Sequence, residues 1–145
     1  MSTVRENLTT LRPFVGVSQL TALSALAQSS EEKEFFVAKL QEYADRVQNT
    51  PKPHGQNTVE DPIVYLHFFG RNYDAWVTER DYLPGEIEDP DNDYSQQSQA
   101  FAFCSFGGPK DRDAELGFVS IQELIENGIE LDLYWTVKPL SEVRK

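Results

Sequence analysis

The chain has 145 residues, of which 39% are hydrophobic and 12% aromatic, and it carries a formal net charge of −11. This length and apolar content are sufficient for one packed domain, or one domain with a helical attachment, and they argue against global disorder. A single cysteine, Cys104, excludes an intrachain disulfide and suits a reducing compartment. The sequence has no signal-peptide core and no apolar run of membrane-spanning length, so we expect a cytoplasmic protein without membrane association.

The negative charge is concentrated in one part of the sequence. Residues 74–132 contain fifteen acids and three bases, whereas residues 1–73 contain eight acids and seven bases. The last thirteen residues carry a net charge of +2. Free nucleic acid and anionic membranes would repel the acidic part, while a basic protein surface would attract it. The charge pattern therefore disfavours direct nucleic-acid binding and favours a basic protein partner.

The first fifty residues predict helices. Residues 3–11 form a short candidate helix that ends before Pro13. Ser18 is the expected N-cap of a second helix, which runs to about Gln28. A third helix is expected to follow, because Ser29 and Glu32 match the spacing of a capping box, with Ser30 as an alternative N-cap. Its apolar residues recur at helical spacing and are Phe36, Leu40, Tyr43 and Val47.

The next residues separate these helices from a β-rich body. Residues 51–61 are polar and contain Pro51, Pro53 and Gly55, which disfavour regular structure and predict a linker. We therefore expect an N-terminal helical segment over residues 1–50, this linker, and an α+β body over residues 62–145. The body contains a long acidic loop over residues 80–98.

The body predicts five strands and one short helix. The strands are expected at residues 63–69, 75–78, 101–106, 115–119 and 131–137. A turn over residues 70–72 joins the first two strands as a hairpin. Ser120 and Glu123 form a capping box before the short helix, which ends at Asn127 and Gly128. The fold class is α+β: an N-terminal helical hairpin followed by a mostly antiparallel sheet of about five strands with one short helix.

Three short motifs of the body resemble a known family. They are W-x-T-E at residues 76–79, E-L-G-F-V-S-x-x-E-L at residues 115–124, and E-L-D-L-Y at residues 130–134. Together they make residues 63–140 similar to a small bacterial domain of unknown function found on plasmids, integrative elements and phages. The resemblance implies a mobile-element setting and a bacterial host cell. It implies no chemistry, because the family has no assigned activity.

Enzymatic and metal sites find little support in the sequence. Cys104 could serve as a nucleophile only beside a base such as His67, and a structural cysteine is the simpler interpretation. The alternation of Asp89, Asp91 and Asp93 imitates the start of a calcium loop, but the later positions lack the glycine and the glutamate that such a loop needs. We therefore expect no cofactor, no metal and no catalytic residues.

The remaining interpretation is an acidic interaction protein. Accessory proteins of mobile elements often counter host defence, and several are acidic and resemble nucleic acid. We expect this chain to inhibit a CRISPR or restriction complex by occupying the basic surface of a nucleic-acid-binding protein or nuclease. The expected partner-binding residues lie in two loops and are Tyr82, Glu86, Glu88, Asp89, Asp91, Asp93, Tyr94, Asp111 and Asp113. Two alternatives stay open: a small enzyme with a cryptic site, and a homodimeric scaffold or adaptor.

Overall fold

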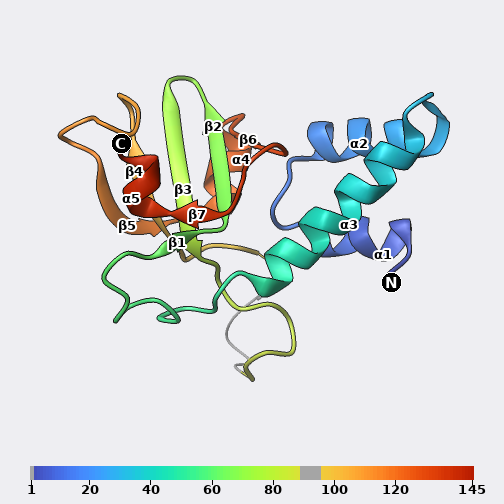
Figure 1. Ribbon diagram of the computed structural model, residues 1–145. Helices are drawn as coiled ribbons and strands as arrows, with labels where there is room; N and C mark the ends of the chain where they lie inside the picture. Colours follow the sequence, from blue (N-terminus) through green and yellow to red (C-terminus); the bar gives the residue numbers. More distant parts are fainter. Residues whose placement is uncertain (1, 89–95) are drawn as a thin grey trace.

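The computed structural model describes residues 2–88 and 96–145 (Figure 1). Three helices form the N-terminal part: α1 (Val4–Leu11), α2 (Val17–Ser29) and α3 (Lys33–Asn49). Two short helices lie in the body, α4 (Ile121–Glu126) and α5 (Leu140–Val143). No helix in the described part of the chain is long and apolar enough to cross a membrane.

The body is built on a five-stranded antiparallel sheet with the order β5-β4-β3-β2-β6. Its strands are β2 (Leu66–Gly70), β3 (Tyr73–Glu79), β4 (Ala100–Ser105), β5 (Glu115–Val119) and β6 (Glu130–Leu131). A separate pair joins β1 (Ile63–Val64) to β7 (Lys138–Pro139). The predicted α+β class and the antiparallel sheet of about five strands are confirmed.

The β2–β3 hairpin closes through a tight turn in which two residues adopt positive φ angles. Arg71 and Asn72 both have positive φ, at 48° and 61°. Two successive residues of this kind match the twist of the flanking strands and give a tight two-residue connection. The hairpin sets the register of the sheet, in which His67 lies opposite Trp76 and Phe68 lies opposite Ala75.

The main core lies between the N-terminal helices and one face of the sheet, which we call the inner face. Leu40, Tyr43 and Val47 of α3 are buried against the same cluster as Leu66 and Phe68 of β2. The predicted apolar stripe of α3 is thus confirmed, with Phe36 half-buried at its start. Burial of each such side chain contributes about 1.5–3 kcal/mol.

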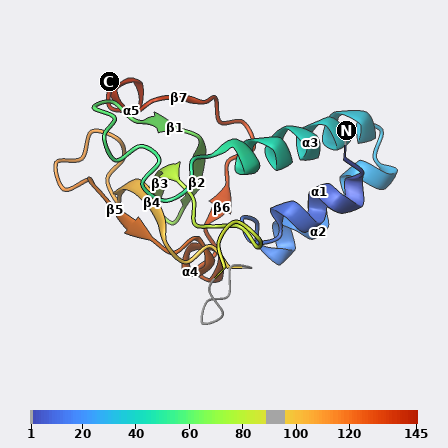
Figure 2. The same ribbon diagram turned by 90° about the horizontal axis from the view of Figure 1, so that it is seen from below.

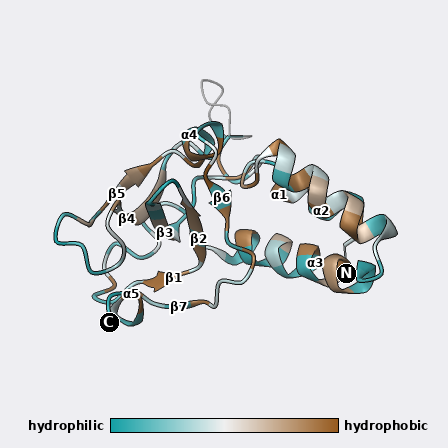
Figure 3. Ribbon diagram, turned by 90° about the horizontal axis from the view of Figure 1, so that it is seen from above, coloured by the Kyte–Doolittle hydropathy of each residue, from teal (hydrophilic) through white to brown (hydrophobic). Residues whose placement is uncertain are grey.

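The opposite face, which we call the outer face, is covered by a smaller cluster. Trp76 of β3 and Phe103 of β4 pack there with Val64, Leu140 and Val143. Figure 2 shows α5, β7 and β1 together on this side, while the three N-terminal helices lie at the other end of the molecule. Figure 3 shows apolar strands in the centre and a hydrophilic loop between β4 and β5.

The last predicted strand is wrong over most of its length. Only Glu130 and Leu131 pair in the sheet, and the Asp132 backbone donates one more hydrogen bond to the His67 carbonyl. The chain then leaves this sheet and pairs next with β1, through β7. The Asp132 carboxylate accepts a hydrogen bond from the Tyr134 backbone, and the Tyr43 hydroxyl donates to the Asp132 carbonyl. These contacts turn the chain away from the sheet, so residues 132–137 do not follow their alternating sequence pattern.

The predicted helix starts also need correction. α2 begins two residues earlier than expected, with Gly16 instead of Ser18 at the N-cap and no side-chain cap. Ser29 is the last residue of α2, and α3 begins at Lys33 after Glu32, also without a side-chain cap. A reciprocal capping box is present instead at α1, between Thr3 and Glu6.

The polar segment over residues 51–61 is held against the body. The Glu79 carboxylate accepts hydrogen bonds from the backbone of His54 and Gln56, at 2.8 and 2.9 Å. The Gln56 side chain binds the backbone of Ile63 and Thr78. This segment therefore packs beside β3, and one cluster of buried side chains joins the helices to the sheet.

Candidate functional site

The acidic loop begins at a buried arginine. Arg80 is 2% exposed and donates five hydrogen bonds, which equal its full donor capacity. Two go to the Val47 and Gln48 carbonyls at the end of α3, and two go to the Glu86 carboxylate at 2.7 and 2.9 Å. Arg80 thus satisfies the free carbonyls of a helix end and holds the start of the loop against it.

Glu86 is committed to this interaction. Its carboxylate also accepts from the Leu83 backbone and lies 3.8 Å from the Lys52 ammonium. Hydrogen bonds from Arg80 lower the pKa of Glu86, with further lowering by the Leu83 backbone and Lys52. The structure therefore uses Glu86, one of the predicted partner-binding residues, inside the molecule.

The two ends of the loop are joined by Gln97, which is fully buried. Its side chain accepts from the Asp81 backbone at 2.9 Å and donates to the Tyr82 carbonyl at 3.4 Å. The Gln97 carbonyl accepts from the backbone of Ile121 at 2.8 Å, at the start of α4. Gln97 therefore places α4 beside the base of the loop, and its role has no signal in the sequence.

Several acids of the C-terminal half remain unpaired on the described surface. Glu88, Glu123 and Glu126 are exposed, and none of them forms an ion pair with a described residue. We call these three residues, with half-buried Tyr82, the loop–α4 surface. The predicted residues Asp89, Asp91, Asp93 and Tyr94 lie outside the described residues.

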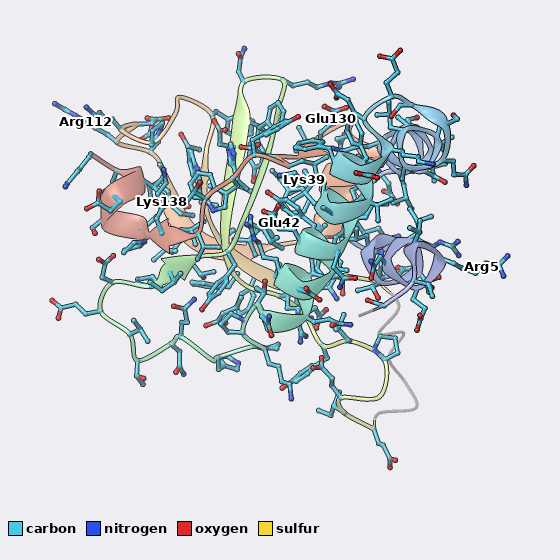
Figure 4. All side chains as sticks on the ribbon, turned by 45° about the vertical axis from the view of Figure 1, so that its right-hand side comes forward. Arg5, Lys39, Glu42, Arg112, Glu130 and Lys138 are labelled. Carbon is cyan, nitrogen blue, oxygen red and sulfur yellow. The ribbon has the colours of Figure 1, made fainter. Side chains whose placement is uncertain are left out.

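The other predicted loop lies elsewhere. Asp111 and Asp113 belong to the β4–β5 connection, where the Asp111 carboxylate accepts from the Asp113 backbone. Figures 1 and 3 place this connection at the far end of the sheet from the N-terminal helices, whereas residues 80–88 lie near the end of α3. Figure 4 shows Arg112 of this loop and Glu130 on opposite sides of the β2–β3 hairpin. The two predicted acidic loops are thus separated in space.

A carboxylate–imidazole–carboxylate array lies on the outer face. His67 Nδ1 is 2.9 Å from the Asp132 carboxylate, and His67 Nε2 is 2.7 Å from the Asp74 carboxylate. The ring stacks on Trp76 with 5.3 Å between ring centroids and 6° between the planes. Carboxylates accept only, so both contacts are hydrogen bonds only when both ring nitrogens carry hydrogen. The array links Asp132 to the β2–β3 hairpin. Sequence analysis missed it because Asp132 is 65 residues from His67 in the chain, and Asp74 is 7 residues away on the next strand.

The alternative of a Cys104–His67 catalytic pair is wrong. Cys104 lies opposite Ala75 and packs with the inner core, whereas His67 lies opposite Trp76 on the outer face. The two side chains are therefore on opposite sides of the sheet. Burial raises the pKa of the Cys104 thiol, which disfavours the thiolate. Among the described residues no group of three metal-ligating side chains is present.

Replacing His67 by phenylalanine is expected to lower the free energy of unfolding by about 1–3 kcal/mol, because Asp74 and Asp132 would each lose a hydrogen-bond partner while staying half-buried. Urea denaturation measures this change. The matched control is His54→Ala, at the other histidine, which is exposed and lies outside the array. Equal stabilities of the two variants would show that the array contributes nothing.

A comparison of the chain with protein-family models, curated proteins and solved structures finds no match.

Proposed function

We propose that this chain is a non-enzymatic interaction protein of a mobile element that inhibits a host CRISPR or restriction complex. In this proposal its carboxylates occupy a basic surface that otherwise receives DNA or RNA. Lysines and arginines of the complex would bind carboxylates in place of phosphates. The protein would thus compete with nucleic acid for the surface.

The proposal is carried by the absence of counter-ions around the exposed acids of the loop–α4 surface. Arg80 is already neutralised by Glu86, and Arg46 and Lys39 both pair with Glu42 on α3 (Figure 4). No described cation pairs with Glu88, Glu123 or Glu126. Their charge is therefore available to an external partner.

The structure narrows the residues on which the proposal rests. Glu86 is used internally, and Asp111 and Asp113 lie at the other end of the sheet beside Lys110 and Arg112. We therefore assign partner binding to the loop–α4 surface, with Asp89, Asp91, Asp93 and Tyr94 contributing on the basis of sequence alone.

Reversing three acids of the loop–α4 surface is expected to abolish inhibition. The test variant carries Glu88→Lys, Glu123→Lys and Glu126→Lys. Its matched control carries Glu31→Lys, Glu34→Lys and Asp45→Lys, which change the net charge equally at exposed positions of the N-terminal part. The readout is plasmid transformation into hosts with an active CRISPR or restriction system, with and without the protein. We expect the test variant to lose at least tenfold of the protection, while the control keeps it.

Two outcomes would contradict the proposal. The first is that the wild-type protein protects against neither system. The second is that both variants lose protection equally, in which case net charge and not this surface is responsible. Binding to the purified complex should also weaken steeply as salt rises, because the contacts are exposed ion pairs.

A further inference from the structure

The open edge of the sheet lies at β5. This strand ends the sheet order, and Figures 1 and 3 show it as the outermost strand of the body. Leu116 is 44% exposed and Phe118 is 64% exposed. β5 contains no proline, lysine or arginine, the residues that commonly protect such an edge from pairing. The strand therefore offers unpaired backbone groups next to exposed apolar side chains.

The same side chains form one wall of a cleft with a volume of about 400 Å³. Leu116 and Phe118 of β5 line it together with Phe101 of β4, and Val59 and Glu60 of the 51–61 segment also line it. Phe118 lies opposite Phe101 in the register, and their rings meet edge-to-face with centroids 5.3 Å apart. The cleft thus lies on the outer face and borders the open edge.

The cleft is negatively charged. Glu60 and Glu79 line it, and no lysine or arginine is among its lining residues. Glu79 is 6% exposed, and each of its carboxylate oxygens accepts one backbone hydrogen bond. No described cation pairs with it. A register shift in β3 between Val77 and Glu79 marks an irregularity at this position, of the kind that redirects a side chain.

Aromatic faces and uncompensated carboxylates together favour a guanidinium group. Arginine stacks on aromatic rings and presents a planar set of donors to carboxylates, and it is less strongly hydrated than lysine. A strand paired with β5 would place alternate side chains on the outer face, within about 4.5–5.5 Å of Leu116 and Phe118. One such side chain would enter the cleft.

We infer that β5 binds an extended segment of a partner protein by strand addition, and that an arginine of this segment occupies the cleft. The inference rests on the proposed function, because it specifies one part of the basic partner. A second copy of this chain fits less well, since two chains with a net charge of −11 repel each other.

The probe is a seven-residue peptide in which arginine alternates with valine, compared with its glutamate–valine counterpart. We expect the arginine peptide to slow hydrogen exchange of the Leu116–Val119 amides at least tenfold and to shift their NMR signals. Phe118→Ala and Glu60→Gln should each weaken binding at least tenfold, because they remove the ring and an exposed carboxylate. The matched control Glu34→Gln removes one exposed acid of α3, outside the cleft and outside the loop–α4 surface, and should change binding less than twofold.

Several results would overturn the inference. They are equal binding of the glutamate peptide, protection that maps to segments other than β5, and unchanged binding by both cleft variants. Slower hydrogen exchange of β5 at a higher concentration of this protein, without any peptide, would identify a second copy of the chain as the occupant. Failure of the plasmid assay with normal peptide binding would remove only the proposed function, whereas plasmid protection without peptide binding would remove only this inference.

Discussion

Replacing Arg80 by alanine is expected to lower the free energy of unfolding by about 3–5 kcal/mol. The change leaves the Val47 and Gln48 carbonyls without a donor and the Glu86 carboxylate without its main cation. Urea denaturation at neutral pH measures the loss. Arg112→Ala is the matched control, because Arg112 is exposed and lies in the far loop, and it should change stability by less than about 0.5 kcal/mol. Equal effects of the two changes would contradict this role of Arg80.

The same ion pair predicts a pH dependence. The pKa of Glu86 is lower in the folded protein than the ordinary value of 4.5. A lowered pKa in the folded state contributes stability above the unfolded pKa, and this contribution is lost as the pH falls through the folded value. Glu86→Gln should therefore destabilise the protein most at neutral pH, and the difference from wild type should shrink below pH 4.5. A difference that grows on acidification would contradict the assignment.

Replacing Phe68 by alanine is expected to cost about 3–5 kcal/mol and to destabilise helices and sheet together. Phe68 is fully buried in the cluster that joins β2 to the three N-terminal helices. Its neighbour Phe69 is 42% exposed on the outer face, so Phe69→Ala is a matched control with an expected cost of about 1 kcal/mol or less.

Two spectroscopic signals report on the unfolding of different parts of the molecule. Helical circular dichroism reports mainly on the N-terminal helices, whereas fluorescence of Trp76 and Trp135 reports on the sheet side. We expect the two signals to change at the same urea concentration in wild type and to shift together in Phe68→Ala. Separate transitions would show that residues 1–50 fold as an independent unit.

The spacing of apolar residues along the chain correctly predicted the buried side of a helix and the positions of two strands. The spacing of Leu40, Tyr43 and Val47 identifies the buried side of α3, and the apolar residues of β3 and β4 indicate strands. The last predicted strand is wrong because the Tyr43 hydroxyl and the His67 ring, both distant in sequence, bind Asp132 at the point where the chain leaves the sheet. Alternation of apolar residues carries no information about such contacts.

Less of the candidate site than of the fold could be predicted from the sequence. A run of acids indicates negative charge but not which carboxylates are used inside the molecule, and Asp74, Glu79 and Glu86 are used there. Nothing in the sequence marks Arg80 as buried, because its partners at residues 47 and 48 belong to a different element. Separation of the two acidic loops likewise follows from the sheet order and not from their spacing in the chain.

The clamp made by Gln97 has a consequence for how this protein can vary. Hydrogen bonds from its side chain hold residues 81 and 82 at one fixed place, and its carbonyl holds the start of α4. The scaffold therefore depends on these two ends and on Glu86, which holds Arg80, and not on the sequence inserted between Glu86 and Gln97. Related chains could exchange this insert, in length and in charge, to match a different target while keeping the same sheet, and an engineered graft at this position should be tolerated for the same reason.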